Sequence, residues 1–289
     1  MLVSNGQHSL LVDGFFTRSG LLASLGGIAP DKNQLKAAVA RYNITGLEAI
    51  FVSHSHFDHG MDAPALAALT GAEVVGSTST RCLVAGYDQR QPDPAACSVE
   101  TRLFHDLGRN KDGEWGNERF EVRLFVTNHG GGRRFLSSTL NRHLGGYIDE
   151  PVTPPAKISD YRAGTVYTIW ILDRNSGKRF LIQPSAGISN LPDDLQADIT
   201  FLGVASLAEM STAEFDLYYQ ELVKAPGSKW VVPIHWENFY RGAGSPIRPR
   251  RNFIDRLDEA KLMLERKAAK NPSVDVIWLT PAERLLLSK

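Results

Sequence analysis

The sequence contains few cysteines, no excess charge of either sign and no long apolar run, and each absence excludes a class of protein. Only two of its 289 residues are cysteines, Cys82 and Cys97, too few for a disulfide framework or a cysteine-rich metal site. We expect both to pack as small apolar side chains. A single bridge between them is the alternative.

Charge and hydropathy exclude two kinds of partner. The 32 Lys and Arg residues are balanced by 32 Asp and Glu residues, so the chain has no net field that would gather a nucleic acid. Its longest apolar stretches, such as Thr165–Leu172, are far shorter than the roughly 20 residues of a membrane-spanning helix. Residues 1–14 lack the basic and apolar segments of a signal peptide. We therefore expect a soluble protein in the cytoplasm, with an exported form whose leader has been removed as the alternative; the oligomeric state is not predicted.

Periodicity predicts alternating strands and helices. Period-2 or β-branched runs predict strands at Ser9–Val12, Ala49–Ser53, Glu73–Ser77, Phe120–Thr127, Val166–Leu172, Arg179–Gln183, Ile199–Val204, Lys229–Ile234 and Val274–Leu279, with an early turn at Asn5-Gly6. Helical spacing predicts helices at Asp31–Tyr42, Asp62–Leu69, Ser211–Val223 and Asn252–Ala269, with a short terminal one at Pro281–Leu287. Three stretches are predicted to be loops: Tyr87–Ala96, Leu107–Asn117 and Gly130–Gly164.

The order of these elements predicts the fold class. Strands and helices are interspersed in both halves, which indicates an α/β or α+β class with helices covering the sheets. The sequence shows no internal repeat and no low-complexity linker. Single cores reach about 250–300 residues, so we expect one domain over residues 1–289.

The segment with the most chemical content is Ala49–Pro64, in which an apolar strand runs into three histidines and an aspartate and then into a helix. Side chains two apart in an extended segment point to the same side, so His54 and His56 can present their imidazoles to one ion. The turn that follows can aim Asp58 and His59 at a second position nearby. Nitrogen and carboxylate ligands of this kind are typical of zinc. The segment therefore predicts a metal site with two adjacent positions.

This segment resembles the His-x-His-x-Asp-His signature of the metallo-β-lactamase superfamily, and the strand before it and the helix after it also match. The resemblance implies a four-layer αββα sandwich, with two mixed sheets face to face and the metals at one edge. The start of the chain, Ser9–Gly14, is similar to an early strand of the family that ends near the site. Asp13 is therefore either an acceptor that orients a ligand histidine or a simple turn residue.

The resemblance also implies where the remaining ligands lie. The third histidine of the first position is expected between a strand and a glycine-rich turn, as His129 is. The last histidine of the second position is expected at a late strand end, and His235 after Trp230–Ile234 resembles that segment of the lactonase-like branch. The implied ligand sets are His54, His56 and His129 for one ion and Asp58, His59 and His235 for the other.

The chain departs from the family at the residue that bridges the two ions. The family closes a strand there with an aspartate, in a phrase like Gly-Asp-Thr-Gly, whereas the matching phrase here is Gln-Pro-Ser-Ala-Gly, which puts Ser185 in its place. A neutral hydroxyl is a weaker zinc ligand and leaves two cations less compensated. Neither Asp198 in the next strand nor Asp173 in a hairpin turn is expected to replace it. We therefore expect one tight zinc and a second that is weak or absent.

Together these features predict an enzyme. Three histidines with an open fourth position support a zinc ion that lowers the pKa of a bound water towards about 7, which supplies a hydroxide nucleophile. Asp58 would orient that hydroxide or hold a second ion, and the substrate would be a small molecule with an ester, lactone, amide or phosphodiester bond. Oxygen-reducing di-iron members carry a glutamate at the second ligand position, so His56 argues against that branch. The alternative is a degenerate, non-catalytic member that binds a metal or another ligand, which Ser185 favours.

Overall fold

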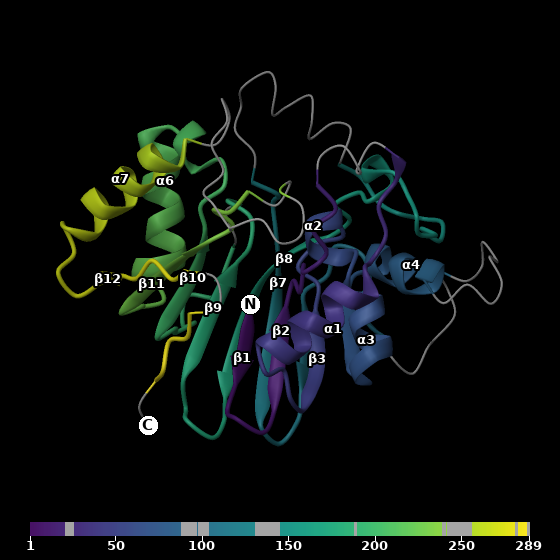
Figure 1. Cartoon of the computed structure of the whole chain (residues 1–289). Helices are drawn as coiled ribbons and strands as arrows, with labels where there is room; N and C mark the ends of the chain where they lie inside the picture. Colours follow the sequence, from purple (N-terminus) through teal and green to yellow (C-terminus); the bar gives the residue numbers. More distant parts are fainter. Residues whose placement is uncertain are drawn as a thin grey trace. The chain divides into compact units, whose positions relative to one another are not determined.

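The computed structural model describes residues 1–20, 26–87, 97, 104–130, 145–187, 190–238, 241, 256–280 and 283–287. The chain forms two compact units, each assembled from separate stretches of the sequence, and most of their helices and strands are labelled in Figure 1. Unit 1 comprises residues 1–111, 142–166 and 239–246, and unit 2 comprises residues 112–141, 167–238 and 247–289. The expectation of a single domain over residues 1–289 stays a prediction.

Unit 1 is built on a five-stranded sheet whose strands lie in chain order. They are β1 (Leu2–Ser4), β2 (Ser9–Val12), β3 (Leu47–Phe51), β4 (Glu73–Gly76) and β5 (Phe104–Asp106). The β1–β2 pair is antiparallel, and β2 to β5 are parallel. Parallel strands end at the same edge of a sheet, so the residues that follow β2 and β3 lie together.

Among the described residues, the α-helices that accompany this sheet are α1 (Lys32–Arg41), α2 (Phe57–Gly60), α3 (Ala63–Thr70) and α4 (Thr78–Tyr87). A 3-10 turn at Ile158–Asp160 also belongs to unit 1. Leu35 of α1 and Leu66 of α3 pack with Ile50 of β3 in one buried cluster. Asp31 starts α1 by accepting hydrogen bonds from the backbone N–H groups of Asn33 and Gln34, as N-cap residues do.

Unit 2 is built on a seven-stranded sheet with the order β12-β11-β10-β9-β8-β7-β6. The strands are β6 (Gly113–Gly116), β7 (Phe120–Thr127), β8 (Val166–Asp173), β9 (Arg179–Gln183), β10 (Ile199–Gly203), β11 (Trp230–Ile234) and β12 (Asp275–Val276). Strands β9 to β12 are parallel, whereas β8 is antiparallel to β9 and β6 is antiparallel to β7.

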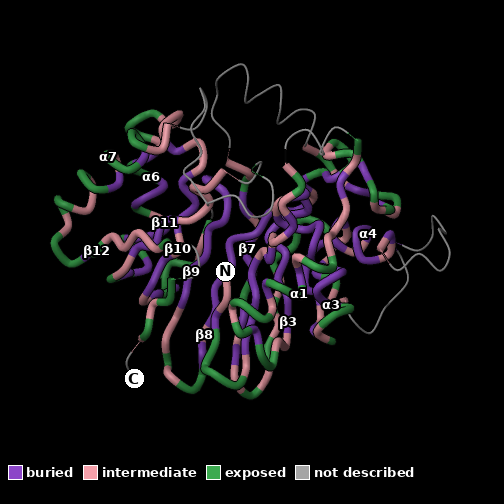
Figure 2. Tube along the Cα trace, viewed as in Figure 1, coloured by how far each residue is buried: buried purple, intermediate pink, exposed green. Residues whose placement is uncertain are grey.

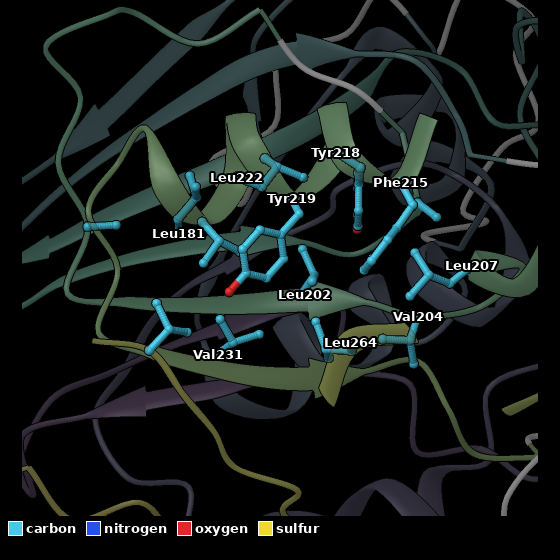
Figure 3. Close-up of a cluster of buried hydrophobic side chains, with 14 of the residues drawn as sticks. Leu181, Leu202, Val204, Leu207, Phe215, Tyr218, Tyr219, Leu222, Val231 and Leu264 are labelled. Atoms are coloured by element: carbon cyan, nitrogen blue, oxygen red, sulfur yellow. The ribbon is translucent and has the colours of Figure 1, made fainter. Parts of the chain in front are cut away.

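Two helices cover part of this sheet. They are α6 (Thr212–Tyr219), which continues into a π-helical turn (Gln220–Lys224), and α7 (Leu257–Ala268); a 3-10 turn lies at Leu207–Glu209. Tyr218 and Tyr219 pack with Leu202 and Leu264 in the large buried cluster of Figure 3. In Figure 2 the inner strands β8 and β9 are mostly buried, whereas α7 keeps one side exposed, as amphipathic helices do.

The mixed α/β class and the predicted strands are confirmed, although the last strand is shorter than expected. The turn at Asn5-Gly6 and the hairpin after Asp173 are also present. The sequence missed β5, α4 and the edge strand β6, which replaces part of the predicted loop Leu107–Asn117. The segment Gly113–Gly116 has two glycines in four residues, so its strand structure depends on pairing with β7 and not on propensity.

The predicted terminal helix at Pro281–Leu287 is wrong for the part that the structure describes. Residues 283–287 have no helical structure, and Leu286 is 88% exposed. Such a short segment cannot form a stable helix without burying an apolar face, because nucleation is unfavourable. Glu283 instead accepts hydrogen bonds from the backbone N–H and the hydroxyl of Thr280.

Cys82 and Cys97 form a disulfide bond, which confirms the predicted alternative of a single bridge. The expectation that both cysteines pack as free side chains is wrong. Both side chains are buried beside Leu83 and Ile148. Disulfides persist mainly in oxidising compartments. The bond therefore favours the exported alternative over the cytoplasm, and the compartment stays a prediction.

We expect reduction of this disulfide to lower the free energy of unfolding by about 3 kcal/mol, the value typical of a loop of this length. The bond joins residues 15 apart, and the opened loop gains conformational entropy in the unfolded state. Urea unfolding with and without dithiothreitol measures the difference. The Cys82→Ser variant should match the reduced protein and should not respond to dithiothreitol. Identical unfolding midpoints for oxidised and reduced protein would contradict the expectation.

Across the described residues, every helix is too short or too polar to cross a membrane.

Candidate metal centre

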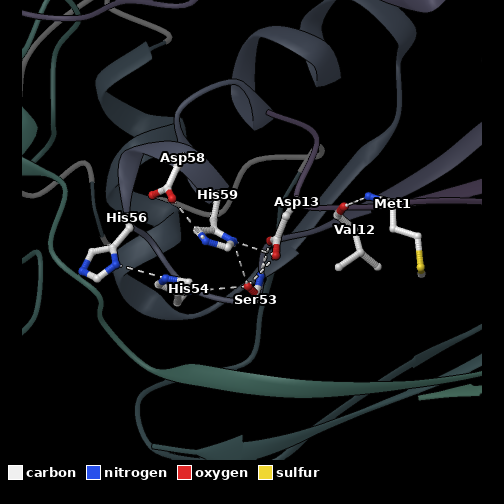
Figure 4. Close-up of polar contacts among 8 residues, drawn as sticks. All are labelled: Met1, Val12, Asp13, Ser53, His54, His56, Asp58 and His59. Atoms are coloured by element: carbon white, nitrogen blue, oxygen red, sulfur yellow. Dashed lines mark hydrogen bonds and ion pairs between the residues drawn. The ribbon is translucent and has the colours of Figure 1, made fainter. Parts of the chain in front are cut away.

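The predicted histidine cluster lies at the carboxyl edge of the five-stranded sheet in unit 1. Strand β3 ends at Phe51, the segment that follows carries His54 and His56, and α2 carries Asp58 and His59. The three histidines are only 1%, 8% and 5% exposed in chain order. Buried polar side chains need partners, and Figure 4 shows that these side chains point toward one another.

His54 and His56 turn nitrogen atoms toward each other. His54 Nε2 lies 3.0 Å from His56 Nδ1, while His54 Nδ1 lies 3.1 Å from the hydroxyl oxygen of Ser53. A tetrahedral zinc with bonds of about 2.0–2.1 Å holds its ligand atoms about 3.4 Å apart. The two facing nitrogens are therefore close to the spacing that one shared ion requires.

Asp58 and His59 form a second pair. His59 Nε2 lies 3.6 Å from Asp58 Oδ2, which is again near the spacing of two ligands on one ion. The other ring nitrogen of His59, Nδ1, lies 2.8 Å from Asp13 Oδ2. A carboxylate on Nδ1 favours the tautomer with its proton there, which leaves the Nε2 lone pair for a metal. The pair thus offers one nitrogen and one carboxylate oxygen.

Asp13 contacts both His59 and Ser53 through its carboxylate. It follows β2 with a φ of 49°, a left-handed conformation that is uncommon for aspartate. Its carboxylate accepts hydrogen bonds from the Ser53 backbone N–H at 2.8 Å and the Ser53 hydroxyl at 2.6 Å, besides its contact with His59. Ser53 therefore links Asp13 to His54, a role that no sequence motif indicates.

In unit 2, His129, Ser185 and His235 lie at one edge of the seven-stranded sheet. They follow β7, β9 and β11 by one or two residues. Strands β9, β10 and β11 are parallel, and the Val204 backbone N–H donates to Ile234 O at the same edge. His235 has a φ of 60°, a left-handed conformation that is uncommon for residues other than glycine.

The backbone of the turn after β9 packs directly against the segment that contains His129. A Cβ atom on Gly187 would lie 1.6 Å from Asn128 O, and one on Gly130 would lie 2.3 Å from the carbonyl carbon of Ala186. The two backbones therefore touch at positions where only glycine fits. Gln183, which is fully buried, accepts from the Thr168 hydroxyl at 3.0 Å and donates to Gly187 O.

We expect Gly187→Ala to lower the free energy of unfolding by about 1–3 kcal/mol, the usual cost of overpacking. We also expect it to displace His129. The added methyl group meets a backbone carbonyl oxygen, which cannot move without moving the Asn128–Gly130 segment. Thermal unfolding measures the effect. Gly26→Ala is the control, because a Cβ atom there meets nothing within 4 Å. Equal melting temperatures for the two variants would contradict the expected clash.

Ser185 is buried, with 7% of its surface exposed. Among the residues that the structure describes, its hydroxyl oxygen has no hydrogen-bond partner. An unsatisfied buried hydroxyl costs about 1–3 kcal/mol, so such a group in a folded protein requires an explanation.

The two aspartates that were not expected to replace Ser185 lie elsewhere. Asp198 precedes β10 and Asp173 closes β8, which places both at the edge opposite to the end of β9. Burial acts to raise the pKa of Asp198, but hydrogen bonds and the charge of Arg179 outweigh it and lower that pKa. The Asp173 carboxylate accepts from the Asn175 backbone N–H and the Ser176 hydroxyl within its turn.

Residues 1–132 match the family model described as the metallo-beta-lactamase superfamily. The matched part contains Asp13, the His54–His59 cluster and His129. This match confirms the resemblance inferred from the His-x-His-x-Asp-His motif, and the two sheets with their helices confirm the predicted fold class. No curated protein matches the sequence.

Several solved structures are similar at low identity. Igni18, described as a novel metallo hydrolase from the hyperthermophilic archaeon Ignicoccus hospitalis, is 15% identical with a TM-score of 0.47, over 97% of this chain and 91% of its own. YhfI from Bacillus subtilis, described as a metallo-beta-lactamase fold protein, is 15% identical with a TM-score of 0.43, over 96% and 87%. Zn(2+)-bound PqqB from Methylobacterium extorquens is 12% identical with a TM-score of 0.42, over 96% and 84%.

Proposed function

Because residues 1–132 match the model of the metallo-beta-lactamase superfamily, whose members are generally metal-dependent hydrolases, we propose that the chain is a zinc-dependent hydrolase. Its substrate in this proposal is a small molecule with an ester, lactone, amide or phosphodiester bond. The observation that carries the proposal is the buried cluster at the carboxyl edge of β3. There, His54 Nε2 lies 3.0 Å from His56 Nδ1, and His59 Nε2 lies 3.6 Å from Asp58 Oδ2.

In this proposal three histidines, His54, His56 and His129, hold the first ion. The second ion, where present, is held by Asp58, His59 and His235. Imidazole nitrogens with one carboxylate are a donor set that suits zinc. The ion supplies Lewis-acid chemistry, activating water and polarising the oxygen of the bond to be cleaved.

The side chains of the cluster have distinct roles in the proposal. Asp58, 11% exposed, accepts a proton from the attacking water at its carboxylate or orients that water. Asp13 keeps the proton of His59 on Nδ1. The burial of His54 and His56 keeps competing water away from their nitrogens, which strengthens binding of a cation.

Ser185 sets the expected number of ions. A hydroxyl at this position compensates no positive charge, so we propose that the second ion binds more weakly than the first. The test is elemental mass spectrometry on protein purified without chelator or added metal, together with hydrolysis assays on a panel of esters and lactones. We expect one zinc per chain and hydrolysis of at least one substrate class. Two tightly held ions per chain would contradict the role given to Ser185.

A second candidate function is a degenerate member that binds a metal or another ligand without catalysis. A neutral serine at position 185 favours it, because the charge that would couple two ions is missing there. A protein of this kind would hold zinc and yet hydrolyse nothing on the panel.

A further inference from the structure

We infer that Asp62 is a positioning residue that fixes Asp13 on His59 and thereby sets which nitrogen of His59 is available as a ligand. Asp62 lies three residues after His59, outside the ligand motif, and none of its side chain is exposed. The inference rests on the proposed function only in taking His59 as a metal ligand.

The side chain of Asp62 does not cap the helix that Asp62 begins. It is the N-cap residue of α3, a position where aspartate ordinarily accepts from the first backbone N–H groups of the helix, yet it makes no such hydrogen bond. Its carboxylate instead reaches the segment after β2. It accepts from the Phe16 backbone N–H at 2.8 Å, and from the backbone N–H and the hydroxyl of Thr17, each at 2.7 Å.

These bonds offset only part of a large desolvation cost. Burial raises the pKa of Asp62, and the hydrogen bonds from Thr17 and Phe16 oppose that shift. Removing the carboxylate would leave two backbone N–H groups near Thr17, itself 2% exposed, without an acceptor. The segment therefore depends on Asp62 for its conformation.

Between Asp13 and the residues that Asp62 holds, the chain is short and closely packed. The Phe15 backbone N–H donates to Asp13 O at 2.8 Å, and Asp13 itself has the left-handed φ of 49°. A Cβ atom on Gly14 would lie 2.4 Å from a methyl carbon of Leu11 and 3.0 Å from one of Leu66 in α3. Asp62, at the start of α3, thus holds the segment that begins with Asp13 against the same helical region that carries His59.

The consequence concerns the proton on His59. Asp13 Oδ2 lies 2.8 Å from His59 Nδ1, and His59 is 5% exposed, so this N–H is shielded from water. When the Asp62 anchor is lost, only the bonds to Ser53 and Phe51 still hold Asp13 in its uncommon φ. The acceptor that selects the His59 tautomer is then less firmly fixed.

The test follows the imidazole N–H of His59 by nitrogen-15 NMR in folded, metal-free protein, with the signal assigned from His59→Gln. In Asp62→Asn the negative charge is lost, and the NH₂ group that replaces one oxygen faces either the two backbone N–H groups or the Thr17 hydroxyl. We expect its His59 Nδ1–H to exchange with water about tenfold faster or more, with a detectable share of the Nε2–H tautomer. Unchanged exchange and tautomer in the folded variant would overturn the inference.

Matched variants separate positioning from general loss of stability. Thr17→Val removes one of the three hydrogen bonds and should give an intermediate exchange rate, whereas Thr17→Ser keeps the hydroxyl and should behave as the wild type. Asp31→Asn weakens the cap of α1 in the same unit, yet its backbone N–H still donates to Thr17, so His59 exchange should not change.

Should Asp62→Asn fail to fold, the Thr17→Val and Thr17→Ser pair decides alone, and equal exchange rates in the two would overturn the inference. The NMR measurement needs no metal and no substrate, so it tests the role of Asp62 even if the protein hydrolyses no substrate. A lack of hydrolysis with the expected NMR result would refute the proposed function and leave the positioning role intact.

Discussion

His54→Ala is expected to remove the tightly bound zinc and to lower hydrolysis by about 10³-fold or more, because metal ions contribute several kcal/mol of transition-state stabilisation. His54 is the most buried histidine of the cluster, at 1% exposed, and its Nε2 faces His56 Nδ1 at 3.0 Å. Alanine removes one of the three proposed ligands and leaves a gap at a buried position. Zinc per chain and the rate on the best substrate are the two quantities to measure.

The matched control is His8→Ala. His8 pairs with Glu48 at 2.7 Å and is 31% exposed, at the amino end of β2 and away from the carboxyl edge that carries the cluster. Its loss should leave the metal content and the rate unchanged. If His54→Ala keeps its zinc and its rate, the proposed first site is refuted. If it loses zinc while the wild type hydrolyses nothing, the non-catalytic alternative is favoured.

The part of the site that the sequence predicts is the part that is local in the chain. His54, His56, Asp58 and His59 fall within six residues, and a strand followed by a helix fixes their directions almost without help from the rest of the fold. Asp13 is 46 residues from His59, and its contact exists because β2 and β3 pair in parallel and end at one edge. Only the family resemblance made Asp13 a candidate.

Ser53, Gln183 and Asp62 were not predicted, because their roles depend on tertiary contacts. Gln183 and Asp62 are fully buried polar residues in segments that otherwise read as an apolar strand and a helix start. Sequence periodicity treats such residues as exceptions to the pattern. Their hydrogen bonds to Thr168 and to Thr17 show that they join distant segments.

The missed and wrong elements have the same cause. Strand β6 and helix α4 have weak propensities of their own and are stabilised by pairing with β7 and by packing of Cys82 and Leu83. The terminal segment has better helix formers but buries none of them, as the exposed Leu286 shows. Local propensity decided neither outcome, since burial outweighs it in each case.

Ser185→Asp is expected to raise the affinity for a second zinc by about tenfold or more, since a carboxylate beside two cations contributes well over 1.4 kcal/mol in a buried site. Ser185 stands at the end of β9, with its hydroxyl buried and partnerless among the described residues. The variant therefore adds charge at the position that we propose corresponds to the family's bridging aspartate. Zinc titration monitored by calorimetry should show two tight sites in place of one.

The control for this variant is Ser185→Asn, which adds nearly the same volume without the charge. Without metal, Ser185→Asp buries an uncompensated carboxylate and should melt at a lower temperature than Ser185→Asn. Saturating zinc should reverse that order, because a ligand that binds only the folded state stabilises it in proportion to its affinity. An equal response to zinc in both variants would show that position 185 faces no cation, and the assignment of Ser185 to the bridge would then fail even if His54→Ala behaves as expected.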